Sequence, residues 1–186
     1  MKMIKDGKSV MINPKLKIFA IAGKARHGKD TVASMIKNNL ESKGYKVLIT
    51  HYADLLKFIC KSLFDWDGEK NAYGRQLLQY VGTDVIRKQA PDYWVNYVID
   101  MLHFFGDNWD YVMIADCRFP NEIDLLKANF ENVCSIRVIR PNFDNGLSIE
   151  QQSHLSETAL DKYDYDLVIY NETDLQNLEK ICKEIH

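Results

Sequence analysis

Two glycines and a lysine near the start of the chain have a spacing that can bind phosphate. In "GKARHGKDT" (23–31), Gly23 is followed by four residues and then by Gly28 and Lys29. Glycines in such a turn let successive backbone N–H groups point at phosphate oxygens. A lysine at this position reaches the phosphate that is transferred. The apolar run before this segment and the amphipathic stretch after it favour a phosphate-binding loop over a chance match.

The residue after the lysine departs from the usual motif. That position normally carries Ser or Thr, whose hydroxyl binds magnesium, but here it is Asp30, and Thr31 comes one place later. A carboxylate there repels phosphate unless a metal ion or the helix dipole offsets its charge. We therefore predict that Asp30 binds magnesium directly or through water and that Thr31 contacts the α-phosphate. The predicted nucleotide-binding set is Gly23, Lys24, Gly28, Lys29, Asp30 and Thr31.

Charged residues also follow three other apolar runs. Asp116 ends the run at 110–116, the usual position of a second acidic group that holds magnesium through water, and Arg118 comes just after it. Arg140 ends the run at 132–140. Asp54 follows the run at 46–52, where it either contributes to a site or caps the next helix, and the residues alone favour neither.

The arginines are the best candidates for clamping phosphate groups, because a planar guanidinium can bind two phosphate oxygens at once. They fall in the glycine-rich loop, in the helical stretch 74–89 and at or near strand ends. We expect them to gather near one edge of the fold, as a site for two phosphorylated molecules requires. The six residues are Arg26, Arg75, Arg87, Arg118, Arg137 and Arg140.

The elements that must position these residues alternate along the chain. Strands are predicted at 16–22, 46–52, 110–116, 132–140 and 166–170. Helices are predicted at 29–44, 53–64, 74–89 (bent or broken near Gly82), 91–105, 120–130, 156–161 and 172–185. This alternation indicates an α/β fold with a parallel sheet covered on both faces. Right-handed crossovers place all carboxyl ends of the strands at one edge, where ligands bind.

Composition sets broader limits. The chain has 186 residues, enough for one domain, and residues 1–15 are polar and read as a loose arm or a short edge strand. A net charge of -2 argues against a nucleic-acid partner held by bulk positive charge. No apolar run approaches the ~18 residues of a membrane span, and we see no signal peptide. The four cysteines form no CxxC pair, which is typical of reduced thiols in a cytoplasmic protein.

Five segments together resemble a known family. "GKARHGKDT", "YADLLK", "GRQLLQYVGTDVIRKQAPDYW", "IADCRFPNE" and "HLSETALD" occur in family order between residues 23 and 161. In these motifs the chain resembles the deoxynucleoside monophosphate kinases of tailed bacteriophages and related bacterial proteins. The resemblance implies a three-layer α/β/α fold with a five-stranded parallel sheet, a P-loop NTPase fold of the nucleoside monophosphate kinase type. It implies one domain over 1–186, with a helical acceptor-binding region at about 53–105 and a short lid at about 141–160.

The resemblance also implies an activity and a set of roles. It implies that the γ-phosphoryl group of ATP passes, with Mg2+, to a deoxynucleoside 5'-monophosphate. Catalytic roles would belong to Lys29, Arg118 and Arg140, and metal binding to Asp30 and Asp116. Substrate binding would belong to Asp54, Lys57, Arg75, Gln79, Arg87, Trp94 and Glu157, with His154 beside Glu157 on the lid. One departure is Leu55, where we expect Pro; it changes the turn and weakens the assignment of Asp54.

Two other functions fit parts of the pattern. A related kinase with a hydroxyl acceptor, of the dephospho-coenzyme A kinase type, needs a general base, which Asp54 could supply. A nucleotide-binding module without transferase activity needs the loop but no second arginine-lined pocket. The number of arginine clamps favours a phosphate acceptor. Base preference stays open, as does a homodimer formed through the last helix or the N-terminal arm.

Overall fold

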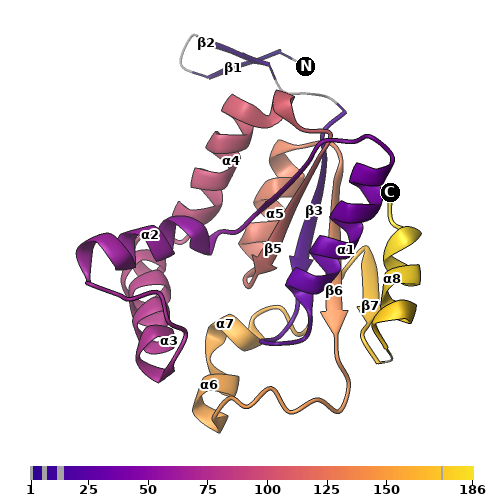
Figure 1. Cartoon of the computed structure of the whole chain (residues 1–186). Coiled ribbons are helices and arrows are strands. Elements are labelled where there is room, and N and C mark those ends of the chain that lie inside the picture. The colour runs from indigo at the N-terminus through magenta and orange to yellow at the C-terminus, as the bar shows by residue number, and fades with distance from the viewer. Residues whose placement is uncertain (1, 6–7, 12–14, 173) are drawn as a thin grey trace.

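A five-stranded parallel sheet forms the centre of the computed structural model, which describes residues 2–5, 8–11, 15–172 and 174–186. Its strands are β3 (Lys17–Ala22), β4 (Val47–Thr50), β5 (Tyr111–Cys117), β6 (Val133–Ile139) and β7 (Leu167–Tyr170). They lie in the order β4-β5-β3-β6-β7, so β3 is central, and all neighbouring strands are parallel (Figure 1). The predicted five-stranded parallel sheet is confirmed.

Helices cover both faces of this sheet because its strands are apolar on both sides. Along β3, Phe19 and Ile21 pack into one buried cluster, whereas Ile18 and Ala20 pack into the other. The first cluster lies under α1 (Lys29–Ser42) and α8 (Leu175–Lys183), and the second lies under α4 (Tyr93–Phe105) and α5 (Pro120–Asn129) (Figure 1). The three-layer α/β/α prediction is therefore confirmed.

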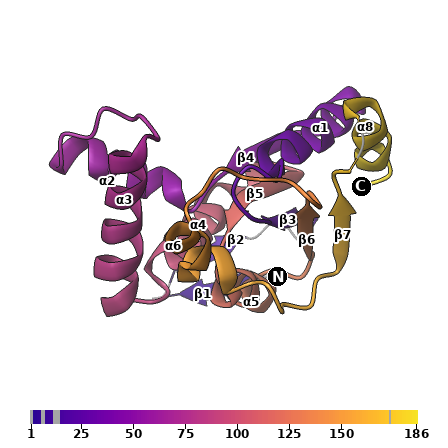
Figure 2. The same cartoon turned by 90° about the horizontal axis from the view of Figure 1, so that it is seen from below.

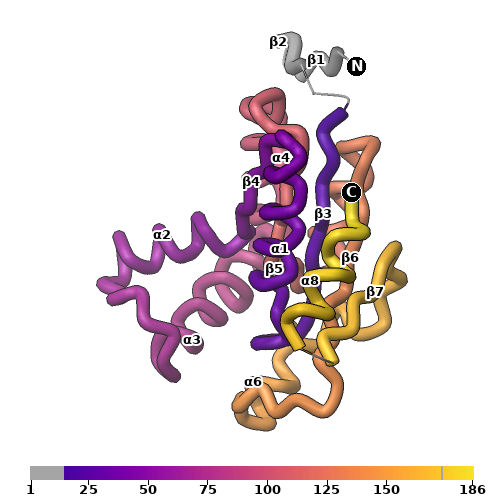
Figure 3. Tube along the Cα trace, turned by 45° about the vertical axis from the view of Figure 1, so that its right-hand side comes forward, coloured from indigo at the N-terminus to yellow at the C-terminus, as the bar shows by residue number. Residues whose placement is uncertain are grey.

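Three helices extend sideways from the sheet next to β4. They are α2 (Ala53–Leu63), α3 (Ala72–Gln79) and the π-helix η1 (Tyr80–Arg87), and Figures 1 and 3 show α2 and α3 standing apart from the layers. The predicted helix at 74–89 was expected to bend or break near Gly82. Instead, its second half continues with the wider turn of a π-helix.

Gly82, within the π-helix, is contacted by two neighbouring helices. The indole Nε1 of Trp94 donates a hydrogen bond to the Gly82 carbonyl at 3.0 Å, which takes that oxygen up outside the helix. Gly82 also packs closely against α2, since a Cβ built on it would lie 2.6 Å from Leu56 Cδ2. A larger residue at position 82 would therefore have to displace the end of the Leu56 side chain.

The predicted polar loop after β6 contains a helix that we did not expect. This helix, α6 (Ile149–Ser153), is followed by α7 (Leu155–Thr158), which is shorter than the predicted helix at 156–161. Ser148 accepts from the Gln151 backbone N–H at 3.2 Å, and the Gln151 side chain accepts from the Ser148 N–H at 3.1 Å. This capping box was legible in the sequence. Figure 2 shows α6 lying across the lower end of the sheet.

The remaining differences between prediction and structure concern the ends of helices and the N-terminal arm. Helix α4 begins at Tyr93 rather than at Pro91, and the short η2 (Gly106–Asn108) follows it. In the predicted N-terminal arm, β1 (Lys2–Lys5) and β2 (Lys8–Met11) form a separate antiparallel pair, so they are not an edge strand of the main sheet. Residues 1, 6–7 and 12–14 of that arm lie outside the described residues. In the described part of the chain, no helix has the length and apolarity needed to cross a membrane.

Candidate functional site

The predicted phosphate loop connects β3 to α1 and has the backbone that its glycines allow. Gly23 and Gly28 have φ values of 153° and 99°, which L side chains rarely adopt. A Cβ on Gly23 would lie 2.5 Å from the Val138 carbonyl oxygen, so β6 leaves no room for a side chain. The loop delivers the chain to α1, whose first backbone N–H groups have no partner within the helix and can bind an anion.

Lys29 begins α1 and folds back over the loop. Its ammonium group donates to the carbonyl oxygens of Gly23 at 2.9 Å and Lys24 at 3.0 Å. Burial, together with the positive charge of Arg118, lowers the pKa of Lys29 to about 7. An anion bound beside Lys29 would reverse this shift, because it would stabilise the ammonium form.

The loop opens onto a cleft of about 470 Å³, which is large enough for a small-molecule ligand. The cleft lies between the carboxyl ends of the strands, the α2–α3–η1 helices and the α6–α7 segment. The predicted site residues that line it are Lys29, Asp30, Lys57, Arg75, Gln79, Arg87, Trp94, Asp116, Arg118 and Glu157. Those that lie outside its lining are Gly23, Lys24, Gly28, Thr31, Asp54 and Arg140.

Only some of the arginines line the cleft. Arg26, Arg75, Arg87 and Arg118 line the cleft, whereas Arg137 and Arg140 do not. The Arg137 guanidinium instead pairs with Asp161 at 2.8 Å. Arg140, the third residue to which we assigned a catalytic role, is exposed, and its guanidinium lies 3.9 Å from the Phe143 ring centroid. Both nevertheless lie at the carboxyl edge of the sheet beside the loop, since Arg137 lines a small pocket with Gly23 and Lys24, and the Arg140 backbone N–H donates to Nδ1 of His27 at 3.0 Å. The expected gathering near one edge therefore holds for these two, although neither side chain lines the cleft.

Arg87 reaches the cleft but is held by a buried carboxylate. Its guanidinium donates to Glu122 and lies 3.9 Å from the Phe119 ring centroid. Glu122 is only 2% exposed and also accepts from the backbone N–H groups of Arg118 at 2.6 Å and Phe119 at 3.0 Å. Burial raises the pKa of Glu122 to about 7, although Arg87 opposes the shift.

Glu122 is a residue that we missed. Its carboxylate holds two cleft arginines, Arg87 by the guanidinium and Arg118 by the backbone N–H. Its signal in the sequence was its place just after Pro120 at the start of α5, where a glutamate side chain reaches back to the N-cap N–H. We had read this segment only for Asp116 and Arg118.

The two predicted metal ligands are both tied to the N-terminal end of α2. The carboxylate of Asp116 accepts from the backbone N–H groups of Tyr52 at 2.8 Å and Ala53 at 3.0 Å. Asp30 lies in the first turn of α1, 3.4 Å from Nε2 of His51. This hydrogen bond lowers the pKa of Asp30 and raises that of His51.

Asp54 serves the start of its own helix. It accepts from the backbone N–H of His51 at 3.0 Å and pairs with the Lys57 ammonium at 2.8 Å. The Asp54 carboxylate also lies 3.3 Å from Nδ1 of the His51 ring. Asp54 is not the N-cap of α2, which is Tyr52 and has no side-chain cap hydrogen bond. The Asp54 carboxylate is not part of the cleft lining either.

The donor set fits a magnesium ion that arrives with a nucleotide. Asp30 and Asp116 offer hard oxygen donors on the phosphate-loop side of the cleft, where Mg2+ typically takes one or two carboxylates plus substrate phosphates and water. Within the residues that the structure describes, no group of three or more His, Cys, Asp or Glu could hold a metal by itself. The protein thus offers part of a coordination shell, as expected for an ion shared with phosphate.

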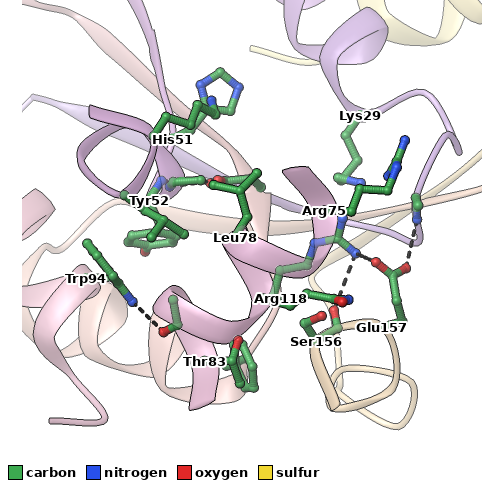
Figure 4. Close-up of a pocket in the computed structure, with 18 of the residues that line it drawn as sticks. Lys29, His51, Tyr52, Arg75, Leu78, Thr83, Trp94, Arg118, Ser156 and Glu157 are labelled. Atoms are coloured by element: carbon green, nitrogen blue, oxygen red, sulfur yellow. Dashed lines mark hydrogen bonds and ion pairs between the residues drawn. The ribbon is translucent and has the colours of Figure 1, made fainter. Parts of the chain in front are cut away.

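Glu157, on α7, contacts the loop between β3 and α1. One carboxylate oxygen accepts from the Ala25 backbone N–H at 2.9 Å, and the other accepts from the Arg118 guanidinium at 2.7 Å (Figure 4). The Arg118 guanidinium also donates to the Ser156 carbonyl at 3.4 Å. His154 begins the same helix and accepts from the Ser156 N–H at 3.2 Å. Glu157 therefore contacts the phosphate loop rather than the end of the cleft near Trp94.

A family model described as deoxynucleotide monophosphate kinase matches residues 50–181. Two curated proteins with the same description are similar to the chain. The protein from Enterobacteria phage T4 is 34% identical over 106 residues, covering 56% of this chain and 41% of the relative. The protein from Escherichia phage RB69 is 29% identical over 113 residues, covering 60% of this chain and 43% of the relative. The chain thus aligns with about two fifths of the length of these relatives.

Solved structures share the fold at low identity. A sugar kinase from Janibacter sp. HTCC2649 has a TM-score of 0.53 at 10% identity, covering 89% of this chain and 91% of its own. Shikimate kinase from Aquifex aeolicus vf5 has a TM-score of 0.50 at 13% identity, covering 88% and 92%. These likenesses concern the fold alone. They confirm the kinase-like α/β architecture, while the phosphate loop itself lies before the range of the family match.

Proposed function

Since the chain belongs to the deoxynucleotide monophosphate kinase family, we propose that it transfers the γ-phosphoryl group of ATP to a deoxynucleoside 5'-monophosphate. The proposal rests on one observation, the contact between the phosphate loop and a cleft lined by cationic side chains. A phosphate loop with Lys29 opens directly onto a cleft that holds further cationic side chains, among them Arg75 and Arg118. One anion would bind at the loop and a second would bind in the cleft.

The cleft has two chemically different ends, which supports a nucleotide acceptor. On one side it is lined by Lys29, Arg118 and Glu157, whereas Leu78, Tyr52 and Trp94 lie toward the other side (Figure 4). A monophosphate group suits the charged end, and a flat base suits the apolar end. Arg75 and Gln79 are four residues apart on α3 and share a helix face, so both can contact the acceptor.

The proposed chemistry needs charge stabilisation more than a general base. The second pKa of a phosphate monoester is about 6, so the acceptor is mostly dianionic at neutral pH and is already a nucleophile. Lys29 and Arg118 would offset the repulsion between the two anions, and Arg87 would shape the cleft from its place on Glu122. A magnesium ion held by Asp30 and Asp116 would neutralise charge on the nucleotide phosphates.

The proposal also assigns roles to two regions of the chain, a cellular location and partners. We assign acceptor binding to the helical region at about 53–105, within which α4 also covers the sheet, and lid movement to about 141–160. A cytoplasmic location is supported by four cysteines that are all free. Nucleic acid and membranes are not among the partners that we propose. Self-association stays a prediction, which sedimentation of the purified protein would test.

The acceptor is tested by measuring ATP consumption with each of the four common deoxynucleoside monophosphates and with dephospho-coenzyme A. Turnover of at least one monophosphate is expected. Turnover of dephospho-coenzyme A alone would favour the kinase with a hydroxyl acceptor. Binding of ATP without turnover of any acceptor would favour a nucleotide-binding module.

A variant separates the acceptor site from the ATP site. Arg75→Ala should raise the KM for the monophosphate by roughly 10- to 100-fold, since hydrogen bonds to charged groups contribute about 1.5–3 kcal/mol. ATP binding, measured by calorimetry without acceptor, should stay unchanged. Lys88→Ala is the matched control, because Lys88 is an exposed cation that ends the same helical stretch and lies outside the cleft lining. Loss of ATP binding in Arg75→Ala would contradict the assignment.

A further inference from the structure

The lid segment brings two carboxylates to the phosphate loop. Besides the contacts of Glu157, Asp161 pairs with the Lys24 ammonium at 3.2 Å. Asp161 also pairs with Arg137. Of the cations that these carboxylates hold, Lys24 belongs to the loop at which the nucleotide phosphates are proposed to bind, and Arg118 lines the cleft beside it. The segment from 157 to 161 therefore supplies negative charge where the proposed substrate would supply its own.

The contact with Ala25 is specific to the loop backbone. Phosphate loops bind phosphate through N–H groups that point into the loop, and the Ala25 N–H is occupied by a carboxylate oxygen of Glu157. A carboxylate oxygen and a phosphate oxygen are equivalent acceptors for such a donor. One N–H cannot form a good hydrogen bond to both at once, so the two anions compete for it.

The contacts of Glu157 are stronger than the pair between Lys24 and Asp161, because Glu157 is buried. Its side chain is 8% exposed, and it joins a backbone donor to a guanidinium. In the pair between Lys24 and Asp161, the side chains are 37% and 36% exposed, so solvent screens their attraction. The hydrogen bonds of Glu157 carry full charge on the acceptor and are short, as charge-assisted hydrogen bonds are.

We propose that Glu157 is an internal substitute for a nucleotide phosphate, which holds α7 against the phosphate loop and is displaced when ATP binds. This inference rests on the proposed function. It changes the role first assigned to Glu157, which was to bind the acceptor. Displacement frees the Ala25 N–H and the Arg118 guanidinium for phosphate oxygens and releases α7 from the loop.

The two roles predict opposite effects of one substitution. Glu157→Gln keeps the size of the side chain and removes its charge. Without nucleotide, Arg118 then has no charged partner at this position. If Glu157 competes with ATP, the variant binds ATP more tightly, on the order of tenfold, because a charged hydrogen bond no longer has to be broken. If Glu157 helps to hold substrate, the variant binds ATP equally well or more weakly.

The experiment is calorimetric titration of ATP, without acceptor, into wild type, Glu157→Gln and Glu150→Gln. Glu150 is an exposed glutamate of α6 in the same lid segment, so its substitution removes the same charge away from the loop. Tighter binding by Glu157→Gln alone supports the inference. Unchanged or weaker binding overturns it, and equal tightening in both variants overturns it as a general charge effect. Failure of wild type to bind ATP overturns both the inference and the proposed function.

Hydrogen exchange of the wild-type protein gives a test that does not depend on any variant folding. Adding ATP should slow exchange at 23–31 and speed exchange at 155–161, because α7 loses its contact with the loop. Slower exchange at both segments would mean that α7 closes over bound ATP. That result would overturn displacement while leaving the proposed kinase function intact.

Discussion

Replacing Arg87 with methionine would leave the buried carboxylate of Glu122 without its cationic partner. Glu122 is 2% exposed and would keep only the two backbone N–H donors of Arg118 and Phe119. Removing one partner of a buried ion pair costs about 3–5 kcal/mol. Because those two donors remain, we expect the lower end, a loss of about 3 kcal/mol at pH 8, against a total stability of about 5–15 kcal/mol for a typical domain.

The size of this loss should depend on pH. The pKa of Glu122 is already raised from 4.5 to about 7 by burial, and loss of Arg87 raises it further. A carboxyl group whose pKa is higher in the folded state binds its proton more tightly there, so stability falls as pH rises from 4.5 through the folded pKa. At pH 5.5 the variant can protonate Glu122, and we expect its loss to be about half of that at pH 8.

Urea unfolding followed by circular dichroism at both pH values measures these losses. Four proteins are compared, namely wild type, Arg87→Met, Glu122→Gln and the double variant. The double variant should recover much of the loss of Arg87→Met, since no charge is then left buried and unpaired. A loss below about 1 kcal/mol at pH 8, or an equal loss at the two pH values, would refute the reasoning about this pair.

Two further predictions concern the phosphate loop. Gly23→Ala should abolish ATP binding in calorimetry, because its Cβ would lie 2.5 Å from the Val138 carbonyl oxygen. As a control, the Cβ of Gly44→Ala meets nothing within 4 Å, and this variant should lose only about 1 kcal/mol of stability through backbone strain. Equal ATP binding by both variants would contradict this prediction. Asp30→Ser should raise the magnesium concentration for half-maximal turnover about tenfold, and full activity at low magnesium would count against a special role for the carboxylate.

Much of the architecture could be predicted because it depends on local pattern. The glycine spacing from Gly23 to Lys29 predicts a phosphate loop, since glycine readily adopts the positive φ values that Gly23 and Gly28 have. The alternation of apolar runs and amphipathic stretches predicts a parallel sheet covered on both faces. These features are properties of neighbouring residues, so no knowledge of distant contacts is needed. The same rule made the carboxyl ends of the strands the place to search for the site.

The pairing of charges was decided only by the tertiary structure. Arg87 and Arg140 looked alike in the sequence, but Arg87 meets Glu122 across 35 positions, while Arg140 stacks on Phe143 outside the cleft. Glu157 contacts Ala25 across 132 positions because the fold brings α7 beside the loop that follows β3. Such partners depend on which strands become neighbours and on which face each helix presents. The sequence determined which residues could bind phosphate, and the fold determined which of them face the cleft and which carboxylates hold them.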